Sequence, residues 1–325
     1  MPNPDRQQYI DQQLNDVAMA YYQVADNFIA PKVFPILPVD KQEAKYYIFN
    51  KADNLRDDMQ RRSNASESAG SGFNLSQDSY HCDVFALHKD VTTRDRKNWT
   101  LPSLTLDDAT AQWLAQQGLQ RMERQWATDF FTTSVWTATG SDTTPTSGLW
   151  SVYATSDPLA DVDAAKTVVL KETGFEPNTL VLGYEVWQKL KRHPLIVDRV
   201  TGGATTANPG NVTRQAVAAI LEVENLYVAK AAKQTQAENE TAVAALVHGK
   251  HALLCYTNPT PSLVAPSCGY TFFWRDVDYG GSTVTVARIP MPHLGVGTER
   301  LEIQKSWDNK ATGSDLGFFW SDAVA

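Results

Sequence analysis

The sequence predicts a mixed α+β fold in which one long helix is combined with strand-rich segments. Three observations support this prediction. A helix-start signal at Thr105 precedes a long amphipathic run, a strand passes directly into a helix at Gly183, and the C-terminal third contains short apolar runs typical of strands. With 325 residues, of which 42% are hydrophobic, the chain is long enough for one large or two moderate domains.

Residues 1–40 are predicted to form an N-terminal arm. Within residues 8–30, apolar side chains recur at three- and four-residue spacing among Asp, Asn and Gln, which is typical of an extended or loosely helical segment. The end of the arm, residues 31–38, contains three prolines. Prolines exclude helix and favour an extended path at the edge of a sheet.

An apolar edge strand of this kind often lies on another chain. We therefore expect Val33, Phe34 and Ile36 to contact a neighbouring subunit. Burying a Phe or Ile side chain contributes about 1.5–3 kcal/mol. The substitution Phe34→Asp is then expected to block assembly and to leave a folded, soluble subunit.

Residues 41–101 are predicted to form an extended hairpin. Residues 46–49 and 80–87 have strand composition, and a Ser- and Gly-rich tip lies between them at 56–72. A loop of this length is uncommon unless it is functional or disordered, and a flexible linker is the alternative. Mixed charges near the tip can set the register between subunits. The charged residues expected at subunit contacts are Lys51, Arg56, Asp57, Asp58, Arg61 and Arg62.

Residues 102–164 are predicted to contain a helix of about 25 residues and about 40 Å that starts after Thr105. Residues 165–265 contain the strand at 179–182 that turns at Gly183 into a short helix. The C-terminal strands are expected at 271–274, 282–289, 300–305 and 316–320.

Charge and composition exclude several classes of protein. The net charge of −8 argues against tight nucleic-acid binding, which needs a basic surface. No run of about 18 apolar residues is present, so no membrane span and no membrane partner are expected. Cys82, Cys255 and Cys268 form no close pair, which favours buried thiols over a disulfide framework or a zinc site.

No catalytic, cofactor-binding or metal site is expected. The sequence lacks the phosphate-binding, dinucleotide-binding, zinc-protease and serine-hydrolase motifs. His248 and His251 fit a turn between two strands better than a metal site. Glu123 lies between Arg121 and Arg124, which favours an ion-paired helix surface over a general base.

Several segments, taken in order, resemble the major capsid proteins of tailed bacteriophages. They are residues 28–39, 119–124, 177–190, 265–274 and 307–320. The resemblance implies the phage major-capsid fold, with an N-terminal arm, an extended β-hairpin loop, a peripheral domain built on a long spine helix and sheet, and an axial domain. It implies a peripheral domain at 102–164 that is completed by 266–325, and an axial domain at 165–265.

The resemblance also implies a function. The chain is expected to assemble with itself, through pentameric and hexameric capsomers, into an icosahedral shell around double-stranded DNA. Expected partners are a scaffolding protein, a portal and weakly contacted packaged DNA. The expected location is the virion, and the host cytoplasm during assembly. The alternatives are an encapsulin-type nanocompartment shell, an enzyme with an unrecognised site, and a tail or connector subunit.

Overall fold

The computed structural model describes residue 23 and residues 25–100, 105–201, 212–236, 243–262, 265–275 and 286–325. Two predicted features lie partly outside the described residues. They are most of the arm at 8–30 and residues 282–285 of the strand expected at 282–289. Among the described residues, no helix has the length and apolarity that crossing a membrane requires.

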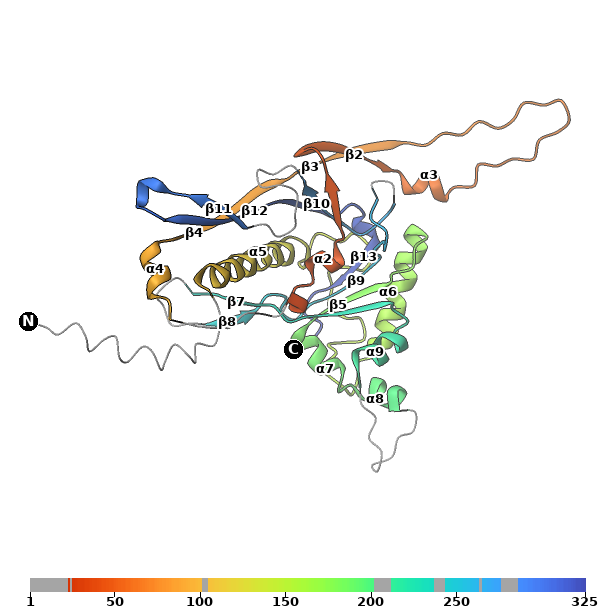
Figure 1. Cartoon of the computed structure of the whole chain (residues 1–325). Helices are drawn as coiled ribbons and strands as arrows, with labels where there is room; N and C mark the ends of the chain where they lie inside the picture. Colours follow the sequence, from red (N-terminus) through yellow and green to blue (C-terminus); the bar gives the residue numbers. More distant parts are fainter. Residues whose placement is uncertain are drawn as a thin grey trace, which may run out of the picture.

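The predicted long helix is confirmed as α5 (Leu106–Phe130). The hydroxyl of Thr105 accepts a hydrogen bond from the backbone N–H of Asp108, which satisfies one of the free donors of the first turn. Leu114 and Trp126 are fully buried on the face that packs against the rest of the chain. The helix therefore serves as a spine for the fold (Figure 1).

A large sheet packs along α5, and its strands come from distant parts of the sequence. The strand order is β1-β10-β12-β11, and β4 also pairs with β12. These strands are β1 (Ile36–Val39), β4 (Asp83–Val91), β10 (Tyr270–Trp274), β11 (Val286–Pro290) and β12 (Glu299–Lys310). As predicted, β1 is an edge strand, but it pairs in parallel with β10 of its own chain.

The second sheet has the order β13-β9-β5-β6. Its strands are β5 (Thr179–Gly183), β6 (Asn225–Ala229), β9 (Ala252–Cys255) and β13 (Gly317–Trp320). Both faces are covered, since Leu180 and Leu182 of β5 pack in one core and Val181 packs in another. Burial on both faces explains the continuous apolar run of this strand.

Helices cover one side of this second sheet (Figure 1). They are α6 (Pro158–Thr173), α7 (Tyr184–Leu190), α8 (Pro194–Thr201) and α9 (Arg214–Ile220). The predicted strand-to-helix turn is confirmed at Gly183, where a Cβ would collide with the backbone carbonyl of Gly249. A short pair of strands, β7 (Ala232–Gln234) and β8 (Ala244–Leu246), lies beside α5 (Figure 1).

The predicted hairpin projects from one end of the molecule (Figure 1). Its strands, β2 (Glu43–Phe49) and β3 (Leu75–His81), pair antiparallel. The second strand was expected at 80–87, but most of those residues belong to β4, which pairs with β12 of the large sheet. Shorter elements complete the fold. They are η2 (Ala25–Asn27), α2 (Ala30–Val33), α3 (Lys51–Leu55), α4 (Thr93–Asn98), η3 (Pro292–Leu294) and η4 (Ser314–Leu316).

One expectation about local structure needs correction. Residues 31–38 were expected to exclude helix, but α2 contains Pro31 at its first turn. Proline is tolerated there because the missing N–H has no partner within the helix. The last strand, β13, was expected at 316–320, and it pairs with β9 of the second sheet.

The three cysteines are unpaired and buried, which confirms the prediction for them. Cys255 and Cys268 lie on either side of the Thr257 hydroxyl, with Sγ–Oγ1 distances of 3.8 and 3.7 Å. Burial raises the pKa of the Cys82 thiol to about 12. Apolar surroundings of this kind keep a thiol protonated and unreactive.

Candidate assembly surfaces

The base of the hairpin is fastened to the large sheet by aromatic packing. Tyr80 stacks on Phe272 with the ring centroids 4.4 Å apart, and Tyr46 packs on the same ring at 5.5 Å. The Tyr46 hydroxyl donates a hydrogen bond of 2.8 Å to Asp78 on the opposite strand. Desolvation and this carboxylate raise the pKa of Tyr46 well above its usual range. The hairpin therefore leaves the body in a fixed direction.

Beyond the base, the tip is closed by local hydrogen bonds. Asn50 caps the first turn of α3 by accepting from the N–H of Ala52. Across the neck of the tip, the Asp53 carboxylate accepts from the N–H of Asn74 at 2.8 Å. The Arg56 guanidinium lies 2.7 Å from the carboxylate of Asp58. These bonds give the exposed tip a defined path.

The structure places the predicted contact residues of the tip in two groups. Arg56 and Asp58 neutralise each other, and hydrogen bonds from Ser71 and Arg56 lower the pKa of the Asp58 carboxyl. Arg61 and Arg62 are exposed, and Arg61 has no partner among the residues that the structure describes. The pairing of the first group reduces the charge that the tip can offer to another molecule.

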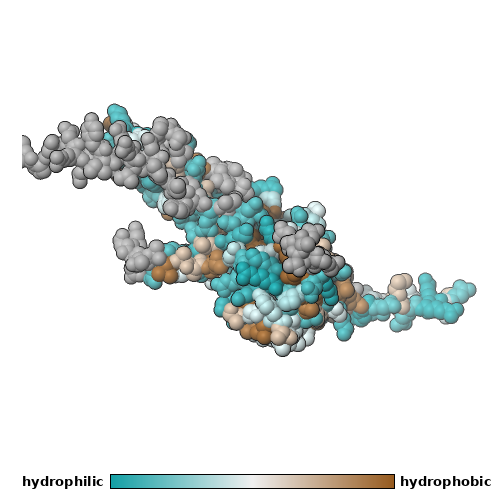
Figure 2. Space-filling view, turned by 90° about the horizontal axis from the view of Figure 1, so that it is seen from below, coloured by the Kyte–Doolittle hydropathy of each residue, from teal (hydrophilic) through white to brown (hydrophobic). Residues whose placement is uncertain are grey.

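The same hairpin exposes large apolar side chains, which the sequence analysis did not single out. Figure 2 shows the hairpin as a thin, mostly hydrophilic projection with scattered hydrophobic residues. The most exposed apolar side chains are Met59 at 92%, Phe73 at 63%, Tyr47 at 58%, Leu55 at 55% and Leu75 at 47%. They follow no regular spacing along the sequence, so an analysis of hydrophobic periodicity did not reveal them.

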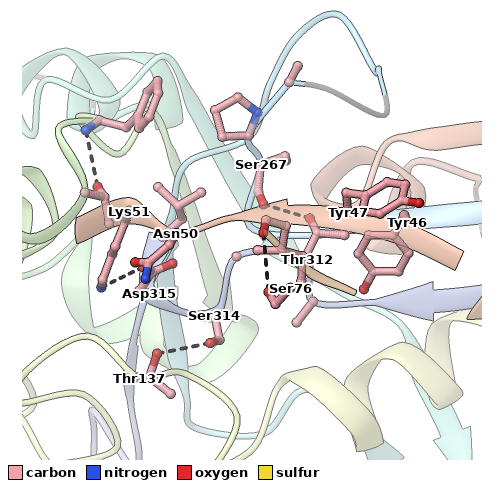
Figure 3. A pocket seen from close by; sticks show the side chains of 18 of the residues that line it. Tyr46, Tyr47, Asn50, Lys51, Ser76, Thr137, Ser267, Thr312, Ser314 and Asp315 are labelled. Carbon is pink, nitrogen blue, oxygen red and sulfur yellow. Dashed lines mark hydrogen bonds and ion pairs between the residues drawn. The ribbon is translucent and has the colours of Figure 1, made fainter. Parts of the chain in front are cut away.

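A groove of about 1070 Å³ lies between the base of the hairpin and the body of the chain. Lys51 and Asp315 form a 2.7 Å ion pair across it (Figure 3). Tyr47, Leu55 and Phe175 supply apolar lining. The groove lies where the hairpin meets the body, and both apolar and polar side chains line it.

The arm residues lie in a different environment from the one expected. Val33 and Phe34 are fully buried inside their own chain. The ring of Phe34 packs between Phe130 at 4.8 Å and Trp126 at 5.6 Å. This packing corrects the expectation that Val33 and Phe34 face a neighbour and that Phe34→Asp leaves a folded subunit. Only Ile36 of the three is partly exposed, and its role stays a prediction.

The expectation for Glu123 is also wrong, because this side chain is 1% exposed and does not form a helix surface. Its carboxylate lies 3.2 Å from Nε2 of His248. The turn predicted at His248 and His251 is confirmed between β8 and β9. Among the described residues, no group of three or more His, Cys, Asp or Glu side chains could hold a metal ion.

A second projecting element, the turn between β11 and β12, lies at the opposite end of the molecule from the hairpin (Figure 1). Val296 in this turn is 98% exposed, and Leu294 is 51% exposed. Gly295 and Gly297 adopt positive φ angles of 123° and 73°. The glycines at 295 and 297 could have marked this turn in the sequence, but they were not used.

The chain is similar in sequence to two phage proteins. It is 28% identical over 321 residues to the major capsid protein of Pseudomonas phage JBD67, and the match covers 97% of each chain. It is 23% identical over 222 residues to the major capsid protein of Burkholderia phage BcepMu, covering 68% of this chain and 69% of the relative. No family model matches the sequence.

Solved structures with the same fold include a phage-related protein from Bordetella bronchiseptica RB50, with a TM-score of 0.70 and 23% identity over 93% of this chain and 94% of that one. The capsid of cyanophage P-SCSP1u matches with a TM-score of 0.58 and 10% identity over 95% and 92% of the two chains. A Synechococcus elongatus encapsulin matches with a TM-score of 0.53 and 11% identity over 100% and 96%.

The fold explains how these similarities fit together. The spine helix, the sheet along it, the projecting hairpin and the helix-covered second sheet occur together in one chain. The sequence matches extend over the same elements, and one of them covers nearly the whole chain. The predicted resemblance is confirmed, and the chain is a capsid shell protein with the fold of the tailed-phage major capsid proteins.

Proposed function

We propose that the chain assembles with itself into pentameric and hexameric capsomers, which build an icosahedral shell around double-stranded DNA. The observation that best supports this is the pair of dissimilar projections at opposite ends of the molecule (Figure 1). Contact between two dissimilar surfaces is heterologous, and heterologous contacts close into rings when the rotation permits. A projecting hairpin suits such a contact because it adds interface area without enlarging the core.

In this proposal, the hairpin reaches a neighbouring subunit. The apolar side chains of Tyr47, Met59 and Phe73 would supply buried area there, since all three are more than half exposed in the single chain. The charged residues would set register more than affinity, because exposed ion pairs are each worth about 0–1 kcal/mol. The proposed polar contacts are Lys51, Arg56, Asp57, Asp58, Arg61 and Arg62. Ile36 in the edge strand β1 is proposed as an apolar contact.

The proposed domain boundaries follow the resemblance, with the axial domain at 165–265 and the peripheral domain at 102–164 and 266–325. The pairing of β13 with β9 suggests that residues 317–320 belong with the axial unit instead. We propose a structural role without catalysis. A scaffolding protein, a portal and packaged DNA are proposed partners, with assembly in the host cytoplasm and a final place in the virion.

The test is to express the chain alone and to image the soluble fraction by negative-stain electron microscopy. We expect closed shells or rings of five and six subunits, with the chain alone or after adding the scaffolding protein. Monomers that persist with the scaffolding protein would contradict the proposal, and a ring of twelve or a tube would indicate a connector or tail subunit. Shells that purify with a cargo enzyme instead of DNA would identify a nanocompartment, which the encapsulin's fold similarity keeps as the second candidate.

A further inference from the structure

Three separate parts of the chain meet at the buried carboxylate of Glu123 in α5. One oxygen, Oε2, accepts hydrogen bonds from the backbone N–H groups of Ile29 at 2.9 Å and Ala30 at 2.8 Å. The other oxygen, Oε1, lies 3.2 Å from Nε2 of His248, a close contact in which neither atom has a hydrogen-bond partner among the described residues. The first backbone donors of a helix have no partner within it, so Glu123 supplies the partners that α2 lacks.

His248 reaches the carboxylate from the turn between β8 and β9. Its side chain is 2% exposed and packs between two rings, with centroid distances of 5.8 Å to Trp126 and 5.1 Å to Phe131. The side chain has no room to turn toward water. The carboxylate and the imidazole are therefore held together, away from solvent, between the start of α2 and the spine helix.

The charged groups around this pair come from every element packed against it. Lys32 of α2 faces the carboxylate and is held 2.9 Å from Asp26. Lys233 of β7 and His251 of the same turn face the imidazole. His251 lies in turn 3.8 Å from the carboxylate of Asp322. No full positive charge lies within ion-pair distance of the Glu123 carboxylate among the described residues, apart from what His248 could itself carry.

Burial makes a separated pair of charges costly here, so the neutral forms of both groups are favoured. Desolvation raises the pKa of Glu123 to about 7, against the opposing effect of the Ala30 and Ile29 N–H groups. Desolvation, Lys233 and His251 lower the pKa of His248 to about 3. Both directions place one proton on the pair, on the glutamic acid and not on the histidine.

We propose that Glu123 and His248 form a buried, uncharged latch: the pair carries one proton, held by Glu123, and the carboxyl group of Glu123 fastens residues 29 and 30 to the spine helix. The latch fixes the point where the N-terminal segment joins the body of the chain. It is a positioning device, because it acts through the backbone of α2 and touches no ligand. The inference rests on the contacts within one chain, so it does not depend on the proposed shell.

The proton count gives the latch a measurable signature. In the unfolded chain, with ordinary pKa values of 4.5 and 6.5, the single proton sits on histidine between these pH values. In the folded chain it sits on Glu123 over the same range. Both states bind one proton, so the pair adds no slope to the dependence of stability on pH between 4.5 and 6.5.

Replacing either residue leaves the pH dependence of stability due to the other residue uncompensated. In Glu123→Gln, the folded chain keeps His248 neutral while the unfolded chain protonates it, so stability rises with pH. In His248→Gln, the folded chain keeps Glu123 protonated while the unfolded chain ionises it, so stability falls with pH. One proton changes the folding equilibrium constant by at most about tenfold per pH unit. The two variants should therefore diverge in opposite directions from the wild-type profile.

The experiment is urea denaturation of the full-length chain at pH 4.5, 5.5 and 6.5. The wild type is compared with Glu123→Gln, His248→Gln and the double variant. We expect opposite slopes for the single variants relative to wild type, up to about a hundredfold in folding constant across the range, and a double variant parallel to wild type. Parallel profiles for all four chains, or equal signs for the two single variants, would overturn the proposal.

A second measurement needs no variant and covers the case in which one of them does not fold. The imidazole of His248 is followed by NMR in the wild-type chain, and we expect it to stay neutral down to pH 5. Hydrogen exchange at the amides of Ile29 and Ala30 is followed in parallel, and we expect protection across that range. An imidazole that titrates near pH 6.5, or amides that exchange at the rate of an open segment, would contradict the latch.

Discussion

The projecting hairpin of β2 and β3 and the segment formed by α2 and β1 follow each other in the sequence, yet they lie in opposite environments. The tip of the hairpin is exposed along its length, and Met59 there is 92% exposed. In the preceding segment, Phe28, Val33 and Phe34 are at most 2% exposed. One element thus extends away from the body, while its neighbour along the chain forms part of the core.

The difference shows that the distribution of apolar and charged side chains decides whether a segment is buried or exposed. Residues 28–34 present large apolar side chains without charges on their inner face, and Trp126, Phe130 and Trp136 form a pocket that takes the Phe34 ring. The tip at 56–72 consists mostly of charged, Ser and Gly residues with Met59 as its one large apolar side chain, so it has no apolar face to bury. The prolines at 31–38 are compatible with a buried segment as well as with an exposed edge strand. They therefore did not predict that this segment is buried.

The largest effect is expected at Phe34. Replacing it with Ala should lower the free energy of unfolding by about 3–5 kcal/mol, because the ring fills a fully buried site. Chemical denaturation measures the change. The matched control is Met59→Ala in the hairpin tip, where we expect a change within about 0.5 kcal/mol. Similar values for both substitutions would remove the contrast between the two segments.

Gly269 provides the next test, because a Cβ at this position would collide with the ring of Phe34. We expect Gly269→Ala to destabilise the chain by about 1–3 kcal/mol through overpacking. In the double variant with Phe34→Ala, the added methyl group enters the space left by the ring. The two changes should then cost less together than the sum of the single changes. Simple additivity would show that the two residues do not share this site.

A smaller effect is expected where the hairpin touches the body, at the ion pair between Lys51 and Asp315. The two side chains are 48% and 24% exposed, so water screens their attraction. A double-mutant cycle with Lys51→Ala and Asp315→Ala should give a coupling of about 0–1 kcal/mol in the unfolding free energy. A coupling well above this range would mean that the ion pair, and not the aromatic base, fixes the direction of the hairpin.

The smallest change in stability is expected from deleting residues 63–72 at the tip. The deletion removes the hydrogen bond from Ser71 to Asp58 but no buried side chain, so the unfolding free energy should change by no more than about 0.5 kcal/mol. Assembly, measured by sedimentation and electron microscopy, should be impaired. A Gly/Ser replacement of equal length is the control that separates loss of length from loss of side chains. If the deletion variant does not fold, residues 63–72 are part of a hydrophobic core and the prediction is wrong.

The sequence by itself determined the elements that depend on local chemistry. The Thr105 cap and the spacing after it gave α5 its start, Gly183 marked the strand-to-helix turn, and the polar run at 56–72 indicated a projecting tip. The ordered set of segments was enough to identify the fold. The charged candidates at the tip were found because charge and flanking strands are local properties.

The tertiary structure alone decided which partner each surface meets. The sequence shows that Phe34 is apolar, but only the folded chain shows that Trp126 and Phe130, more than 90 residues away, complete its pocket. Glu123 was expected at the surface because Arg121 and Arg124 flank it. The fold buries it because the backbone N–H groups of Ile29 and Ala30, from a distant part of the sequence, supply its hydrogen-bond partners, and the ring of His248 packs beside it. Burial depends on contacts between segments, and periodicity along one segment does not contain that information.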